Sequence, residues 1–140
     1  MSDTIKFHFN VDGENFSSAG EASVVVKKKL RQLGFSPEVI RKVSIAMYEG
    51  EINMVIHANG GDADVEVTDE AIIITLTDTG PGIPDVSLAM QEGYSTAREN
   101  IRALGFGAGM GLPNMKKYTD YMDIETTVGV GTKITMKVNL

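Results

Sequence analysis

The amino-acid sequence predicts an α+β protein: a two-layer α/β sandwich whose sheet is mixed but mainly antiparallel and carries its helices on one face. Strand-like and helix-like segments follow in the order strand, two helices, two strands, loop, helix, two strands. This separation of helices from hairpins favours a layered fold over alternating β-α-β units. The chain has 140 residues, 42% of them hydrophobic, with no repeat or linker, so residues 1–140 are expected to form one domain.

The first third of the chain predicts one strand and one helix. Ile5–Asn10 alternates apolar and polar residues, as a half-buried strand does. Ser17 or Ser18 is the expected cap of a helix that runs to Leu33 and stops at Gly34.

A second helix is expected to begin with Ser36 as its cap and Pro37 in its first turn, and to stop at Gly60-Gly61. Gly50 inside this helix costs about 1 kcal/mol relative to alanine. Either it lets another backbone or a ligand come close beside Glu49, or it is a tolerated defect. The residues predicted to point inward are Val39, Val43, Ala46, Met47, Met54 and Ile56.

A hairpin comes next, with strands at Asp64–Val67 and Ile72–Thr77 and a turn at Asp69-Glu70. It is followed by a glycine-rich stretch from Gly80 to Gly111, with a short helix expected around Val86–Gln91. The chain then ends in a helix and a second hairpin. These last elements are a helix from Leu112 to about Tyr121 and strands at Asp123–Val128 and Lys133–Val138, joined by Gly129-Val130-Gly131.

Composition excludes several classes of protein. A net charge of −6 and an isoelectric point near 4.8 argue against nucleic-acid binding, and the basic run Lys27–Lys29 is expected to be a solvated helix face. The chain has no cysteine, which excludes disulfides and thiolate metal sites. The N-terminus lacks the features of a signal peptide and no apolar run is long enough to cross a bilayer, so a cytoplasmic location is expected.

Two polar residues on the second helix are candidates for chemistry. Glu49 and Asn53 are four residues apart and therefore share a helix face. A carboxylate placed this way can serve a hydroxyl nucleophile, and an amide oxygen can bind Mg²⁺, which prefers oxygen ligands and substrate phosphates. Alone, the same spacing also fits an ordinary polar face.

Two glycine-containing motifs follow. Asp78-Thr79-Gly80-Pro81-Gly82 ends an apolar strand, where the aspartate can accept a hydrogen bond from an adenine amino group, although an ordinary turn has the same composition. Gly105–Leu112 carries four glycines directly before a helix, and free N–H groups there can cradle phosphates. No Gly-Lys-Ser/Thr follows, so it is not a P-loop, and a flexible connector is the alternative.

Together, in this order, these elements resemble the gyrase, MutL and histidine-kinase (GHKL) superfamily, which has the Bergerat fold. Glu49-x-x-x-Asn53 is similar to its N box, Asp78–Gly82 to its G1 box and Gly107–Leu112 to its G2 box. Gly131-Thr132 matches the late Gly-Thr pair whose threonine supports the adenine site. The likeness spans roughly residues 36–138.

Within this superfamily the sequence resembles the serine/threonine kinase and anti-sigma regulatory factor family, and it is most similar to the RsbT-like switch kinases. The anti-sigma kinases share the boxes but not the segment Gly93–Thr96. Asp78–Asp85, Ala89–Thr96 and Gly111-Leu112-Pro113 carry that likeness. One departure is the segment Ala97–Phe106, which makes the lid longer than in RsbT-like kinases. Arg98 and Arg102 lie in this extra stretch. They are expected either to contact phosphates or a partner, or to be solvated side chains.

The resemblance implies a Mg-ATP-dependent serine/threonine kinase that phosphorylates a STAS-domain regulator of a partner-switching pathway and so controls a sigma factor or a PP2C-type phosphatase. Glu49 would be the catalytic base and Asn53 the Mg²⁺ ligand. Pairing into a homodimer, as superfamily members often do, is a further expectation, with the first strand and its helix as a candidate interface. The implied nucleotide-binding residues are Asn53, Asp78, Gly80, Gly82, Ile83, Tyr94, Ser95, Thr96, Gly107, Gly109, Met110, Gly111, Leu112 and Thr132.

Other activities stay open on the sequence. The chain can instead be a non-catalytic switch that binds ATP to shape its lid and then sequesters or activates a partner, as an anti-sigma factor or phosphatase activator does. An ATPase with water as the nucleophile is chemically compatible with the same carboxylate. His8 and His57 are expected to be structural, because nothing here resembles the dimerisation helices of a histidine kinase.

Overall fold

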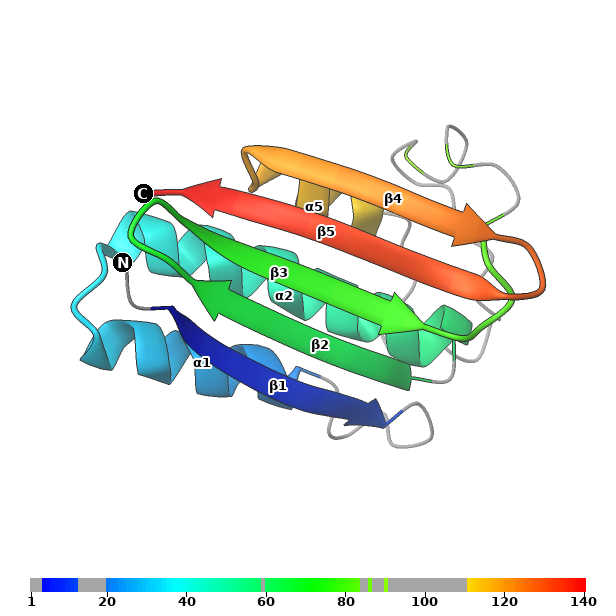
Figure 1. Ribbon diagram of the computed structural model, residues 1–140, viewed down its shortest axis with the longest axis horizontal. Coiled ribbons are helices and arrows are strands. Elements are labelled where there is room, and N and C mark those ends of the chain that lie inside the picture. Colours follow the sequence, from blue (N-terminus) through cyan, green and yellow to red (C-terminus); the bar gives the residue numbers. More distant parts are fainter. Residues whose placement is uncertain (1–3, 13–19, 59, 84–85, 87–89, 91–110) are drawn as a thin grey trace.

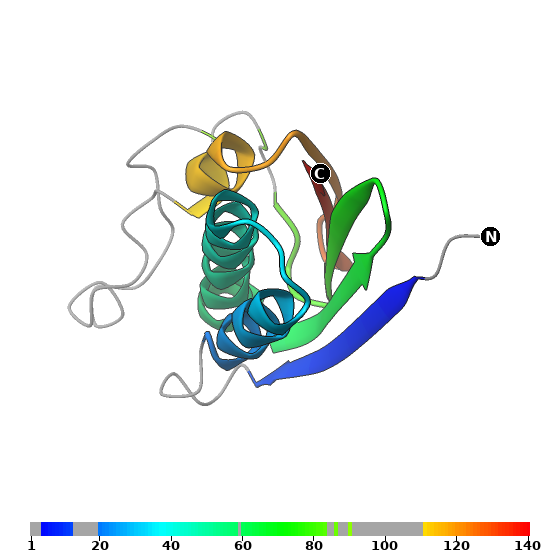
Figure 2. The ribbon, with the colours of Figure 1, turned by 90° about the vertical axis from the view of Figure 1, so that its left-hand side faces the viewer.

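The computed structural model describes residues 4–12, 20–58, 60–83, 86, 90 and 111–140. In these residues it delimits five strands and three helices, arranged in two layers (Figure 1). Figure 2 shows that α1, α2 and α5 all lie on one face of the sheet. The predicted two-layer α+β class is therefore confirmed.

The sheet has the strand order β1-β2-β3-β5-β4, and all four pairings between the described strands are antiparallel. The expected mixture of directions is thus absent from these strands. The strand bounds are β1 Ile5–Asp12, β2 Gly60–Val67, β3 Ala71–Asp78, β4 Tyr121–Thr127 and β5 Gly131–Asn139.

The helices are α1 Glu21–Gln32, α2 Pro37–Ala58 and α5 Gly111–Lys117. Helix α2 lies in the middle of its layer and packs against both α1 and α5 as well as the sheet. The core between the layers is apolar, with Met47, Ile74 and Met136 among its fully buried side chains. Because α2 contacts α1, α5 and the sheet, a site between the helices and the sheet involves residues of α2.

Several predicted boundaries are confirmed and others are wrong. Ser36 Oγ accepts the N–H of Val39 at 3.3 Å at the start of α2, and Gly34, with φ of 85°, follows the end of α1 as expected. The last helix ends at Lys117 and does not reach Tyr121, because Tyr121 pairs with Lys137 as the first residue of β4. Strand pairing with β1 also starts β2 at Gly60, four residues before the predicted Asp64.

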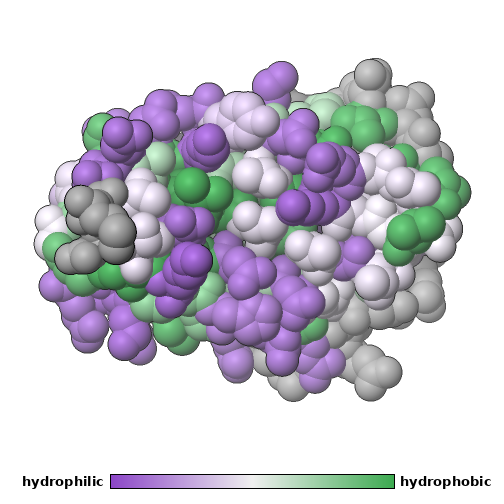
Figure 3. Space-filling view, in the orientation of Figure 1, coloured by the Kyte–Doolittle hydropathy of each residue, from purple (hydrophilic) through white to green (hydrophobic). Residues whose placement is uncertain are grey.

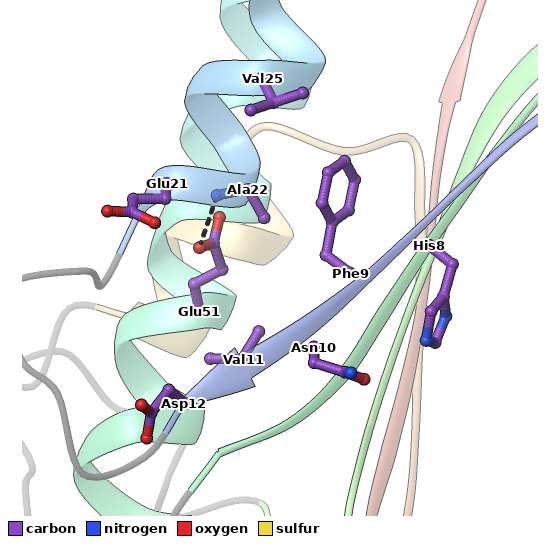
Figure 4. Close-up of a pocket in the computed structure, with 9 residues that line it drawn as sticks. All are labelled: His8, Phe9, Asn10, Val11, Asp12, Glu21, Ala22, Val25 and Glu51. Carbon is purple, nitrogen blue, oxygen red and sulfur yellow. Dashed lines mark hydrogen bonds between the residues drawn. The ribbon is translucent and has the colours of Figure 1, made fainter.

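Helix α1 begins differently from the expectation. Ser17 and Ser18 lie outside the described residues, and Gly20, in the left-handed region, occupies the N-cap without a side-chain cap of its own. The N–H groups of the first turn are instead accepted by Glu51 of α2 (Figure 4). A carboxylate from a neighbouring helix therefore satisfies donors that would otherwise be buried without partners.

The opposite face of the sheet carries no described helix and is mostly hydrophilic (Figure 3). Lysines 27–29 of α1 are also exposed, as predicted. Apolar side chains gather at the tip of the β4–β5 hairpin, where Val128 and Val130 are 64% and 65% exposed. Of the described helices, none combines the length and the apolar character needed to cross a membrane.

Candidate nucleotide-binding site

A small pocket lies between α2 and the end of the sheet, bringing together residues from two of the predicted motifs. Its volume is about 30 Å³, room for little more than a water molecule and far below the roughly 300–1,000 Å³ of small-molecule sites. A nucleotide base therefore requires the walls to separate. The lining residues are Gly50, Asn53, Met54, Ala58, Leu76, Asp78, Pro81, Gly82, Ile83, Thr132 and Ile134.

Asp78 and Thr132 form the polar end of this pocket. They are directly opposite one another in the register of β3 and β5, so their side chains are neighbours on the face that the helices cover. Thr132 is 7% exposed. The carboxylate of Asp78 accepts the N–H of Gly80 at 2.9 Å, which bends the chain directly after the strand.

The Pro81–Ile83 segment is fastened to the β4–β5 hairpin. The N–H of Ile83 donates to Thr126 Oγ1 at 2.8 Å, and the N–H of Gly129 donates to the Pro81 carbonyl at 2.8 Å. Gly82 has φ of 79°, and a Cβ there would lie 2.6 Å from the carbonyl oxygen of Thr127. Only glycine fits this close approach of backbones.

Glu49 and Asn53 lie one turn apart on α2, and both are half-buried. Glu49 reaches the start of α5, where Asn114 Nδ2 donates to Glu49 Oε1 at 3.4 Å. A Cβ at Gly111 would lie 3.8 Å from Glu49 Oε2. The carboxylate is therefore next to the last residue of the glycine-rich stretch, while Asn53 faces the pocket.

The surroundings of Gly50 show a close approach, as the first of the two explanations above expected, but by a different group. A Cβ at this position would lie 2.1 Å from Leu76 Cδ1 and 3.4 Å from Met115 Cε. The glycine therefore permits a close approach of α2 to the sheet and to α5, although the group that approaches is a leucine side chain rather than a backbone or a ligand.

Some predicted site residues cannot be placed in this way. Tyr94, Ser95, Thr96, Gly107, Gly109 and Met110 lie outside the described residues, as do Arg98 and Arg102. Within the predicted short helix around Val86–Gln91 the structure describes Val86 and Met90, and the N–H of Met90 donates to the Val86 carbonyl at 3.0 Å. Leu112 is 7% exposed and belongs to the hydrophobic core.

The donor set fits Mg²⁺ held mainly by a nucleotide. No group of three or more His, Asp or Glu side chains suited to a metal occurs in the described part of the chain. A single amide oxygen, that of Asn53, lines the pocket beside a carboxylate on the same helix. Magnesium keeps several waters and takes most of its remaining ligands from substrate phosphates, so one protein ligand is sufficient.

A larger cavity, of about 410 Å³, lies between β1 and α1 (Figure 4). Its charged lining residues include Asp12, Glu21 and Glu51. A negative wall disfavours a triphosphate, and Glu51 already accepts hydrogen bonds from α1. The motif residues therefore define the better nucleotide site, although its pocket is smaller.

Two polar residues of this region, Thr126 and Asn114, were missed by the sequence predictions. Thr126 follows the strand alternation of β4 and could have been assigned to its inner face, but not to a contact with Ile83. Asn114 lies on the helix that was predicted after the glycine-rich stretch. Nothing local indicates that its side chain reaches Glu49.

The comparisons with known proteins decide the family. The family model described as histidine kinase-, DNA gyrase B-, and HSP90-like ATPase matches residues 38–140. The chain belongs to this family. Its members bind ATP, generally with Mg²⁺.

The relatives found within the ATPase family are named as a serine/threonine-protein kinase and as anti-sigma F factors. The chain is 32% identical over 108 residues to the serine/threonine-protein kinase RsbT of Bacillus subtilis, covering 74% of this chain and 75% of that protein. It is also 32% identical over 137 residues to the anti-sigma F factor of Caldanaerobacter subterraneus subsp. tengcongensis, covering 94% and 89%. The predicted resemblance to switch kinases and anti-sigma factors is thereby confirmed.

Solved structures agree on the fold. The RsbU and RsbW domains of Rv1364c from Mycobacterium tuberculosis superpose with a TM-score of 0.64 at 15% identity, covering 96% of this chain and 32% of that one. The mycobacterial sensor histidine kinase MprB gives a TM-score of 0.54, also at 15% identity, covering 96% and 97%. At this level of identity the likeness concerns the architecture alone.

Proposed function

We propose that this ATPase-family chain, as one domain, is a Mg-ATP-dependent serine/threonine protein kinase of a bacterial partner-switching pathway. Its substrate is a STAS-domain regulator, and its output is control of a sigma factor or a PP2C-type phosphatase. The observation that carries the proposal is the position of Glu49. Its carboxylate lies beside Gly111, at the end of the stretch proposed to hold the phosphates, and one helical turn from Asn53.

Glu49 is proposed to act as the general base. The carboxylate takes the proton of the serine or threonine hydroxyl while that oxygen forms a bond to the γ-phosphorus. The bond between the γ-phosphorus and its bridging oxygen breaks, and ADP leaves with the electron pair. Positioning supplies most of the acceleration in such a transfer.

The other residues of the site bind and orient. Asp78 accepts a hydrogen bond from the adenine amino group, with Thr132 beside it, and the backbone N–H groups of the Gly107–Gly111 segment take the phosphates. Asn53 holds Mg²⁺, which neutralises phosphate charge when bound. Ser95 and Thr96 are proposed phosphate contacts from the lid.

A second function is favoured by the anti-sigma F factor among the relatives. In this version the chain binds ATP to shape its partner-binding surface and sequesters or activates a protein without transferring phosphate. The two functions separate at Glu49, since only phosphoryl transfer needs a base.

The test is a transfer assay with γ-labelled ATP and Mg²⁺ in lysate of the source organism. Glu49→Gln should abolish labelling of the partner while ATP binding by the purified chain stays within about twofold, because the base acts only in the chemical step. Glu38→Gln is the matched control, since Glu38 lies on the same helix and its side chain is 79% exposed.

A labelled small protein that appears with wild type and with Glu38→Gln, but not with Glu49→Gln, supports the kinase. Labelling by Glu49→Gln at the wild-type rate contradicts the assignment of the base. Measurable ATP binding without any labelled protein contradicts the kinase and supports the non-catalytic switch.

A further inference from the structure

Asn114 of α5 contacts the side chain of Glu49. Its Nδ2 donates to Glu49 Oε1 at 3.4 Å, and within the part of the chain that the structure describes no other hydrogen bond reaches the Glu49 side chain. An ionised carboxylate only accepts hydrogen bonds, so the Asn114 amide must turn its N–H₂ group toward it. The contact is longer than the usual N–H···O distance of about 2.7–3.2 Å. Hydrogen bonds that support catalysis are often long without substrate and tighten when it binds.

Packing of α5 against α2 holds the backbone of Asn114 in place. Gly111, Asn114 and Met115 are three and four residues apart along α5, so they share the helix face toward α2. Met115 is fully buried, and its Cε would be 3.4 Å from a Cβ on Gly50, the residue after Glu49. The Asn114 amide therefore meets Glu49 from a helix that is already anchored next to it.

The two carboxylate oxygens of Glu49 have different surroundings. Oε1 accepts from Asn114, whereas Oε2 is the oxygen nearest to Gly111, 3.8 Å from the position of a Cβ there. Gly111 is the last residue of the glycine-rich stretch proposed to hold the phosphates. The final torsion of a glutamate side chain has a broad energy well. Without the Asn114 contact, the carboxylate would therefore rotate over a wider range.

We infer that Asn114 is a positioning residue for the proposed catalytic base: it holds Oε1 of Glu49 so that Oε2 faces the phosphate-binding stretch. Oε2 then takes the proton of the serine or threonine hydroxyl while the hydroxyl oxygen bonds to the γ-phosphorus and ADP leaves with the electron pair. In this role Asn114 contacts neither ATP nor the acceptor protein and acts through Glu49. The role rests on the proposed kinase function, in which a small misplacement of the base lowers the rate strongly.

The first test observes the contact by NMR, through the side-chain amide signals of Asn114 in the purified chain. Glu49→Gln should shift these signals, because it removes the charge that the N–H₂ group faces. Glu38→Gln, at an exposed position of the same helix, should leave them unchanged. Asn114 signals that do not respond to Glu49→Gln overturn the inference, whether or not the chain is a kinase.

The second test measures how fast γ-labelled ATP labels the acceptor protein in lysate of the source organism, over a range of ATP concentrations. Asn114→Leu keeps the approximate shape and removes the amide. It should lower the maximal rate about tenfold, the size expected for one hydrogen bond to a charged group. The ATP concentration that gives half the maximal rate should stay within about twofold, because the base acts in the chemical step. Lys116→Gln, at an exposed position of α5, is the matched control and should behave as wild type.

Glu49→Asp separates positioning from a purely structural role. Aspartate is one methylene shorter and cannot meet Asn114 in the same way. Adding Asn114→Leu to Glu49→Asp should therefore lower the remaining rate by less than about twofold. A structural role would lower the rate by the same factor with either side chain at position 49, and that result overturns the inference.

Asn114→Asp decides the question if Asn114→Leu fails to fold. It has the shape of asparagine but places a second acceptor against Glu49, so its maximal rate should fall at least as far. A maximal rate equal to wild type in a folded variant overturns the inference and leaves the kinase proposal intact. Absence of any labelled protein with wild type, although the chain binds ATP, overturns the proposed kinase function and with it the role of Asn114.

Discussion

At the scale of single residues, Glu51 is a carboxylate inside the described core. It is 2% exposed and accepts N–H groups of Gly20, Ala22 and Ser23 at 3.0, 3.2 and 2.6 Å. Burial raises its pKa above the ordinary 4.5, and the three backbone donors oppose this effect only in part. Glu51 therefore joins α1 to α2, and its contribution to the stability of the fold depends on whether its carboxyl group is charged.

We predict that Glu51→Gln lowers the free energy of unfolding by about 1–3 kcal/mol, because an amide cannot accept from the same three donors without also placing its N–H₂ among them. The raised pKa means that the folded state binds the Glu51 proton more tightly than the unfolded chain. The stability that Glu51 contributes is thus fully present below pH 4.5 and declines as the pH rises through the folded pKa.

Urea denaturation of wild type and Glu51→Gln over a series of pH values checks this sign. The cost of the substitution should be largest at the acidic end and shrink toward neutral pH. Glu38→Gln, on the exposed side of the same helix, should change the free energy by less than about 0.5 kcal/mol. A cost that grows with pH would contradict the assignment.

At the scale of elements, the close contact of α2 with the sheet gives the candidate pocket its narrow shape. Because Gly50 has no Cβ, the side chain of Leu76 fills the space that a Cβ would take, and Met115 of α5 lies next to that space. Gly50 and Leu76 both line the pocket, so the contact that brings α2 close to the sheet also narrows the pocket.

Gly50→Ala should destabilise the protein. Alanine improves the helix by about 1 kcal/mol, but its methyl group would be 2.1 Å from Leu76 Cδ1, and overpacking a core costs about 1–3 kcal/mol. Leu76→Val removes the clashing methyl group, so the double variant should be more stable than the sum of the two single effects. Thermal unfolding of all four proteins gives the coupling, and strict additivity would show that the contact is not the cause.

At the scale of the whole molecule, the proposed nucleotide joins parts that are distant in the chain. Helix α2, the end of β3 and the start of β5 line the pocket, while Glu49 reaches α5. The pocket is smaller than a base, so the proposed binding requires its walls to move apart. Part of the binding free energy is spent on this opening.

Mg-ATP should stabilise the folded chain by about 2.7 kcal/mol at a concentration of 100 times its dissociation constant. Asp78→Asn should reduce the effect of ATP with or without metal, whereas Asn53→Ala should remove mainly the increment that Mg²⁺ adds. Thermal unfolding with ATP, with Mg-ATP and with GTP separates these cases. Asp64→Asn, on the open face of the sheet, serves as the control, and an equal shift with GTP would contradict the assignment of the base end.

The sequence by itself determined the fold class, the order of the elements and the family. These depend on local signals: strand alternation, the Ser36 cap, the Gly34 stop and the glycine-containing motifs in their order. Local signals failed where pairing decides the boundary, as at Tyr121, which pairs with Lys137, and at Gly60, which pairs with Asp12.

Only the tertiary structure decided how the candidate site is supported. The contacts of Glu51 with Ser23, Thr126 with Ile83 and Asn114 with Glu49 span 28, 43 and 65 residues of chain. Each joins a side chain whose own neighbourhood carries no sign of its partner. A donor and an acceptor that far apart meet only because the packed layers and the strand register bring them together.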